Sequence, residues 1–106
     1  MGYQGGFLTQ NLSGLTVGSY DLDPTFDEDV TAYTVDTNDA TNTVSATAEA
    51  TGATVEIFLN GVSQGSGTGT LSKSLTWTAS TDTAQVKVTL NSSVKTYTIT
   101  VTHDGI

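Results

Sequence analysis

The sequence has no cysteine, no arginine, one proline, one histidine and no long apolar run. Because cysteine is absent, neither a disulfide framework nor a thiolate metal site can form, and the core alone must hold the fold. The 106 residues correspond to one domain, which buries roughly 65% of the surface of the unfolded chain, enough for a core. No segment has the length and apolar character of a membrane span, so membrane insertion is not expected.

Positive charge is also scarce, since three lysines face eleven acidic residues and the net charge is −8. Binding to nucleic acid requires cations that neutralise phosphates, so nucleic acid is excluded as a partner. The same deficit argues against anionic membrane surfaces, and the acidic excess is interpreted as a solubility device.

The first residues, 1–10, are rich in glycine and are interpreted as a flexible lead-in, with a short tail at 104–106. The start has neither the basic nor the apolar region of a secretory signal. We therefore expect either a small protein made without a signal or a domain excised from a longer protein, with the folded domain at 11–103.

Threonine makes up about a fifth of the chain, and apolar residues alternate with polar ones in short runs between turn-forming residues. The alternation predicts about seven strands, near 12–17, 32–35, 43–49, 55–59, 71–77, 86–90 and 96–102. Residues 61–70, which follow the Asn60-Gly61 turn, are rich in glycine and serine and are interpreted as a mobile loop. The pattern predicts an all-β, antiparallel immunoglobulin-like sandwich with one face of each sheet buried.

The stretch Leu22–Val35 holds the only proline and many of the acidic residues. Pro24 fixes its own φ and has no N–H group, so a central strand cannot run through it. Asp27 is expected to cap a tight turn over 27–29. We interpret the stretch as a crossover from the first strand to the second, which closes one end of the core. The side chains predicted to be mostly buried are Phe26, Tyr33, Val35, Ile57, Val88, Tyr97, Ile99 and Val101.

Three motifs carry a resemblance: Leu12-x-x-Leu15-x-Val17, Leu22-x-Pro24-x-Phe26-x-x-x-Val30-x-x-Tyr33-x-Val35 and Tyr97-x-Ile99-x-Val101. Together they resemble the bacterial cadherin-like β-sandwich domain, an immunoglobulin-like module, from about residue 11 to 103. The spacing of proline, phenylalanine and tyrosine is the most specific part. Two turns depart from the family pattern, because Ser80–Thr83 replaces a glycine-asparagine turn and Asn91–Ser93 replaces a turn through glycine.

The resemblance implies a non-enzymatic structural or adhesion module displayed on a bacterial surface or a phage particle. Its expected location is extracellular, on a cell surface or in a virion, beside other modules of a larger protein or particle. A protein or a surface glycan would be its partner. The alternative is a carbohydrate-binding accessory module of a secreted polysaccharide-active protein. The calcium-binding motifs of true cadherins are absent.

Two ligand sites are considered from the residues themselves. Clustered carboxylates at Asp21, Asp23, Asp27 and Asp29, beside Glu28, could bind Ca²⁺, but the alternating ligands and central glycine of an EF-type loop are missing. The alternative to an ion site is a turn whose carboxylates face water, and we favour it, so no metal or other cofactor is expected. Aromatic side chains at Tyr3, Tyr20 and Trp77 could form a carbohydrate platform, although a sandwich of this size usually buries its one tryptophan.

No catalytic residues are predicted. His103 is the only histidine, and no nucleophile and base can be assembled around it. A further alternative is a Lys–Asn isopeptide crosslink, which needs a buried lysine, an asparagine and an acid in contact. The three lysines are Lys73, Lys87 and Lys95, and Lys73 shares a face with Leu71 and Leu75.

Overall fold

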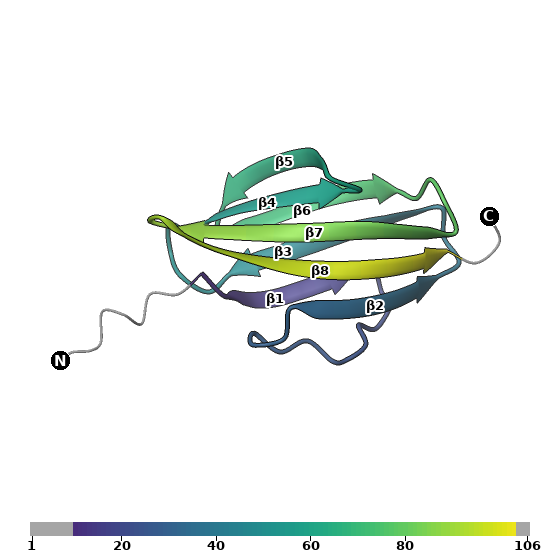
Figure 1. Ribbon diagram of the computed structural model, residues 1–106, viewed down its shortest axis with the longest axis horizontal. Helices are drawn as coiled ribbons and strands as arrows, with labels where there is room; N and C mark the ends of the chain where they lie inside the picture. The colour runs from purple at the N-terminus through teal and green to yellow at the C-terminus, as the bar shows by residue number, and fades with distance from the viewer. Residues whose placement is uncertain (1–9, 104–106) are drawn as a thin grey trace.

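A computed structural model describes residues 10–103, which fold into eight strands in two packed sheets (Figure 1). The three-stranded sheet has the order β1-β3-β6, and the five-stranded sheet has the order β2-β8-β7-β4-β5. The strands are β1 Leu12–Val17, β2 Ala32–Thr37, β3 Thr41–Ala48, β4 Thr54–Leu59, β5 Val62–Thr68, β6 Thr70–Thr76, β7 Thr81–Leu90 and β8 Ser93–His103. The predicted all-β sandwich is confirmed, with one strand more than expected.

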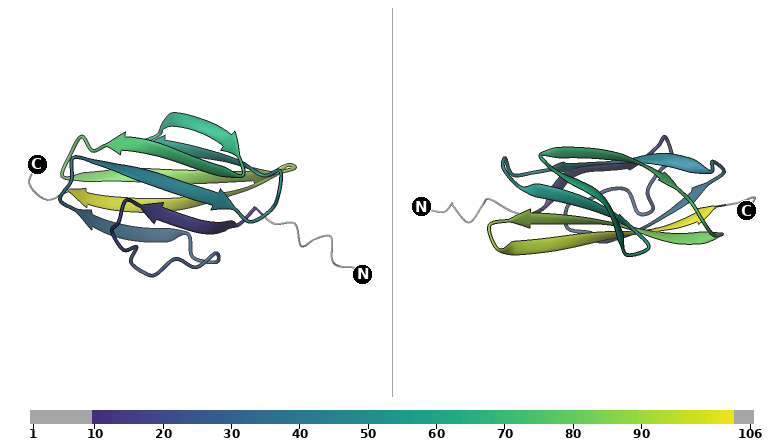
Figure 2. Two further views of the ribbon diagram at one scale, coloured as in Figure 1. Left: turned by 180° about the vertical axis from the view of Figure 1, so that it is seen from behind. Right: turned by 90° about the horizontal axis from the view of Figure 1, so that it is seen from above.

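The core lies between the two layers, which Figure 2 shows edge-on in its right-hand view. Alternating side chains of both sheets fill it, as the period of two along each strand requires. Seven of the eight side chains predicted to be buried are at most 2% exposed. Phe26 is the exception, because it lies on the crossover outside both sheets and only packs against the core from the side.

The first strand contains a β-bulge that explains its irregular apolar spacing. Leu12 and Leu15 are an odd number of residues apart, so a regular strand would place them on opposite faces. The register of β1 against β3 shifts between Leu12 and Gly14, and both leucines are buried as a result.

The predicted loop at 61–70 is wrong, because most of it is strand β5 together with the first residue of β6. The Asn60-Gly61 turn was predicted correctly: both residues have positive φ, as a two-residue type I′ hairpin requires. β5 is an edge strand of its sheet and contributes no buried apolar side chain. The hydrophobic alternation that identifies strands is therefore missing from it.

The sandwich is also not wholly antiparallel. β2 pairs with β8 in parallel, with Tyr33 opposite Ile99 and Val35 opposite Val101. The parallel pair follows from the crossover, which returns the chain to the end of the molecule where β1 began before β2 starts. Within residues 10–103, no helix is long and apolar enough to cross a membrane.

Replacing Gly65 with alanine should lower the free energy of unfolding by about 1–3 kcal/mol. Gly65 has a φ of +135°, and a Cβ there would lie 2.7 Å from Cε of Lys73. Gly14 provides the control, since a Cβ at that position meets nothing within 4 Å. We expect Gly14→Ala to stay within about 0.5 kcal/mol in the same urea titration. Equal effects of the two variants would contradict the assignment of β5.

Candidate functional site

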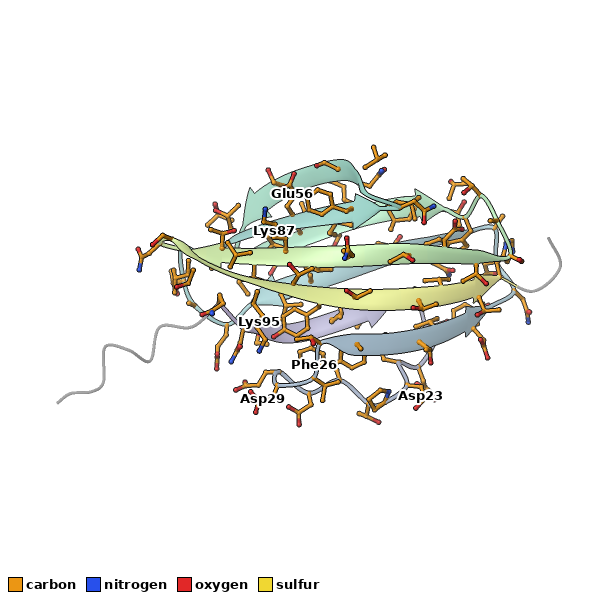
Figure 3. The ribbon with its side chains drawn as sticks, viewed as in Figure 1. Asp23, Phe26, Asp29, Glu56, Lys87 and Lys95 are labelled. Carbon is orange, nitrogen blue, oxygen red and sulfur yellow. The ribbon has the colours of Figure 1, made fainter. Side chains whose placement is uncertain are left out.

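The crossover between β1 and β2 carries the chain from the three-stranded sheet to the five-stranded sheet (Figure 3). Leu22, Phe26 and Val30 pack their apolar side chains against the core from outside. After Asp23, whose peptide bond to Pro24 is cis, the crossover leaves the sheet edge. Before that point, Asp23 and Thr34 exchange two backbone hydrogen bonds of 2.8 and 3.0 Å. The predicted role of Leu22–Val35 as a crossover is confirmed.

Two tyrosine hydroxyls from neighbouring strands fix the backbone of the crossover. The Tyr33 hydroxyl donates to the carbonyl oxygen of Asp27 at 2.7 Å and accepts from the Asp27 N–H at 3.0 Å. The Tyr97 hydroxyl donates to the carbonyl oxygen of Glu28 at 2.7 Å and accepts from the Leu12 N–H at 3.0 Å. Burial raises the pKa of Tyr33, so its hydroxyl stays protonated and able to donate.

The ring of Phe26 covers both tyrosines. Its centroid lies 6.0 Å from that of Tyr33, in a stacked arrangement, and 6.2 Å from that of Tyr97. Such distances are those of favourable aromatic pairs. The phenylalanine and tyrosine of the motif, together with Tyr97, therefore hold the crossover on the end of the core.

Lys95, at the start of β8, joins this cluster to the residue that precedes β1. Its Nζ donates to Oδ1 of Asn11 at 2.6 Å and to the carbonyl oxygen of Glu28 at 2.7 Å. Nδ2 of Asn11 donates in turn to Oε2 of Glu28 at 3.4 Å. The Nζ also lies 5.2 Å from the centre of the Tyr97 ring. We call Asn11, Glu28, Lys95 and Tyr97 the end clamp, because they connect the first strand, the crossover and the last strand.

An open groove of about 590 Å³ runs between β1 and the crossover. Two of the candidate calcium ligands, Asp21 and Asp23, line the groove, as does Tyr20. The full lining is Leu15, Thr16, Tyr20, Asp21, Leu22, Asp23, Thr25 and Phe26. The groove combines apolar and acidic side chains beside the outer edge of β1, which is an edge strand of its sheet.

The four aspartates of the calcium hypothesis are all exposed and are spread along the crossover. Oδ1 of Asp27 accepts from the Asp29 N–H at 2.8 Å, and the Asp27 carbonyl accepts from the Val30 N–H at 2.9 Å. Asp27 thus caps the tight turn, as predicted. Across residues 10–103, the structure gathers no group of three or more histidine or acidic side chains that could hold a metal ion.

The aromatic residues of the carbohydrate hypothesis are not brought together. Trp77 is 4% exposed, and its indole N–H donates to Oδ1 of Asn42 at 2.9 Å inside the sandwich. Its candidacy as a platform residue is wrong, because a buried ring offers no face to a sugar. Tyr20 is half-buried, and its hydroxyl donates to Oδ2 of Asp39 at 3.2 Å. Tyr3 lies outside the described residues.

Trp77 should therefore emit at short wavelength and be protected from iodide and acrylamide quenching. The burial of its ring and the single indole hydrogen bond are the physical reason. Because the chain has one tryptophan, the emission spectrum reports this position alone. Emission typical of a water-exposed indole, or a spectral shift on adding a glycan, would contradict the placement.

Two buried polar residues, His103 and Asp82, lie where β8 ends and β7 begins, at the other end of β8 from Lys95. His103 is 8% exposed, and within residues 10–103 its Nδ1 has no hydrogen-bond partner. Asp82, which the sequence analysis did not single out, is 2% exposed. Its carboxylate accepts from Asn60 Nδ2 at 2.8 Å, the Thr78 N–H at 2.9 Å, the Thr78 hydroxyl at 3.1 Å and the Ala79 N–H at 3.3 Å.

The hydrogen bonds to Asp82 decide its protonation. Burial by itself would raise the pKa of this carboxyl, but the donors on Asn60, Thr78 and Ala79 outweigh it and hold the pKa below the ordinary value. Asp82 is therefore ionised at neutral pH. It organises the turn before β7, where the family pattern would have had glycine and asparagine.

Comparison with known families gives one result. A family model described as a cadherin-like beta sandwich domain matches residues 12–104, a range that contains all eight strands and the crossover. Neither the curated proteins nor the solved structures give a match.

Proposed function

The chain belongs to the family of cadherin-like β-sandwich domains, and from this premise we propose that it is a non-enzymatic structural module displayed on a bacterial surface or a phage particle. It sits beside other modules of a larger protein or particle. Adhesion, where it occurs, uses a protein or glycan partner at a loop end or a sheet edge.

The observation that carries the proposal is the direction in which the chain enters and leaves the sandwich. β1 begins at one end of the long axis, and β8 ends at the other (Figure 1). Tension applied through the two ends acts parallel to the strands, so it loads the hydrogen bonds between them in shear. β8 is paired with β7 over ten residues and with β2 over six, so these bonds must break together. A module that spaces or connects others under load needs this geometry.

The non-enzymatic part of the proposal draws on the environment of the buried carboxylate among residues 10–103. Hydrolytic acid catalysis needs a carboxyl whose pKa is raised, next to a cleft. Asp82 is the buried carboxylate among residues 10–103, and its pKa is lowered. His103 is buried at the end of β8 and does not line the groove beside β1.

Single-molecule pulling through the two ends tests the proposal. The chain that is pulled carries Lys95→Arg, since arginine keeps the positive charge of the end clamp and cannot be joined to Asn11 by an isopeptide bond. We expect one cooperative unfolding event that releases the whole sandwich, because β1, β8 and the strands between them share the core. Gradual, stepwise extension at low force would contradict a role as a module under load.

The carbohydrate-binding alternative has one favourable observation, which is the groove that holds Tyr20 next to Asp21 and Asp23. A half-buried aromatic ring beside carboxylates can stack on a sugar and bind its hydroxyl groups. A glycan array read with wild type and Tyr20→Ala tests it. Saturable binding that disappears in the variant would favour this alternative over a purely structural role, and no binding would eliminate it.

A further inference from the structure

The end clamp holds a primary amine against a carboxamide, and these groups come from positions 84 residues apart in the sequence. Nζ of Lys95 lies 2.6 Å from Oδ1 of Asn11. Since a C=O bond is about 1.2 Å long, Nζ is no more than about 3.8 Å from the Cγ of Asn11. Reacting atoms in near-attack geometry lie about 3–3.5 Å apart, so a small rotation of either side chain suffices.

We propose that Lys95 and Asn11 form an intramolecular isopeptide bond. The uncharged amine of Lys95 attacks the Cγ of Asn11, a Cγ–Nζ bond forms, and the Cγ–Nδ2 bond breaks. One proton moves from Nζ to Nδ2, and ammonia leaves. The step needs no oxidant, metal or added reagent, so atoms and charge balance within the chain and the released ammonia.

Glu28 contacts both nitrogens of the reaction through two different groups. Its Oε2 accepts from Nδ2, the leaving nitrogen, at 3.4 Å, and its carbonyl oxygen accepts from Nζ, the attacking nitrogen, at 2.7 Å. The Glu28 carboxyl group, which contacts the leaving nitrogen, can protonate it as it departs, while the Glu28 backbone carbonyl positions the attacking nitrogen. Tyr97 closes one side of the site with its ring and anchors the Glu28 carbonyl with its hydroxyl.

Neither of the other two lysines has a comparable arrangement within residues 10–103. The Lys73 side chain, which shares a face with Leu71 and Leu75, passes over Gly65. Lys87 lies opposite Glu56 on the outer face of the five-stranded sheet. Among the three lysines, Lys95 is therefore the one whose amine is held against an asparagine carboxamide in the described residues. The sequence alone could not distinguish it from the other two.

The bond would join the residue before β1 directly to β8. Tension that enters at Asn11 would pass into Lys95 and along β8 to the far end, without loading β1 to β7. The inference does not depend on the proposed function, because the chemistry follows from the clamp alone.

Intact mass spectrometry of the wild-type chain tests the inference. The expected mass is lower than that of the sequence by one ammonia, after incubation at pH 7 or at pH 9, where more amine is uncharged. Trypsin cuts after lysine but not after a modified one, so residues 1–73 should be recovered joined to 88–106. An unchanged mass at both pH values, or a link through another lysine, overturns the proposal.

Three variants locate the reaction. Lys95→Arg should restore the full mass, and Glu28→Gln should slow the loss of ammonia, while Lys87→Arg should leave the loss unchanged. Loss of ammonia that persists in Lys95→Arg overturns the proposal. The tryptic digest of the wild-type chain keeps the test decisive even where a variant fails to fold.

Discussion

Replacing Tyr97 with alanine is expected to lower the free energy of unfolding by about 4–5 kcal/mol. The side chain is fully buried, and its ring contacts both Phe26 and Lys95. Truncation would leave a large cavity and would also free the Leu12 N–H and the Glu28 carbonyl from their shared partner. The measurement is urea denaturation at 25 °C, followed by Trp77 fluorescence.

Two further substitutions separate the ring from the hydroxyl. Tyr97→Phe keeps the ring and removes two hydrogen bonds, so we expect a loss of about 1–3 kcal/mol. Phe26→Ala should cost about 2–3 kcal/mol, less than a fully buried aromatic, because Phe26 is partly exposed on the crossover. A loss below about 1 kcal/mol for Tyr97→Ala would mean that the crossover does not pack on the core.

The second large effect is expected at Asp82, where Asp82→Ala should cost about 3 kcal/mol at pH 7. Removing the carboxylate leaves four donors, on Asn60, Thr78 and Ala79, without their acceptor at the start of β7. Asp36→Ala is the matched control, since Asp36 is an exposed aspartate in a strand. We expect that control to change stability by less than about 0.5 kcal/mol.

The pH dependence of stability should report the same carboxylate. The pKa of Asp82 is lower in the folded chain than its ordinary value of 3.8. Its stabilising contribution is therefore complete above pH 3.8 and is lost as the pH falls through the lower, folded-state pKa. The difference between wild type and Asp82→Ala should shrink in acid. A difference that stays constant from pH 7 to pH 2 would show that Asp82 is not the group that titrates.

The parts of the fold that the sequence predicted are those with a regular hydrophobic period or a defined turn chemistry. β3, β4, β7 and β8 alternate cleanly, and Asn60-Gly61 adopts the turn that this pair favours. β5 was missed because it is an edge strand rich in glycine and serine, with no buried side chain on either face. The parallel pairing of β2 with β8 depends on the path of the crossover, which local periodicity does not encode.

The candidate site was harder to predict, because its members are far apart in the chain. The sequence pointed to the acidic crossover and considered its aspartates as metal ligands, yet their side chains are exposed and spread out. The contacts that organise the end of the sandwich involve Asn11, Glu28 and Lys95, which nothing local connects. Asp82 had an indirect signal, since the segment Ser80–Thr83 departs from the family pattern. The Asp82 carboxylate accepts hydrogen bonds from the Thr78 and Ala79 N–H groups, in the turn that precedes β7.

The most direct test of the account is the force needed to unfold the sandwich in two pulling directions. Pulling Lys95→Arg through its two ends loads the strands in shear. In the second direction, force is applied between the N-terminal end and a cysteine introduced by Ser92→Cys. Both points lie at the same end of the molecule, because the hairpin between β7 and β8 lies at the end where β1 starts (Figure 1), so the strands are not loaded in shear along their length. We predict a several-fold higher unfolding force through the ends than through Ser92→Cys. Equal forces in the two directions would contradict the claim that this sandwich is a structural module built to carry load along its strands.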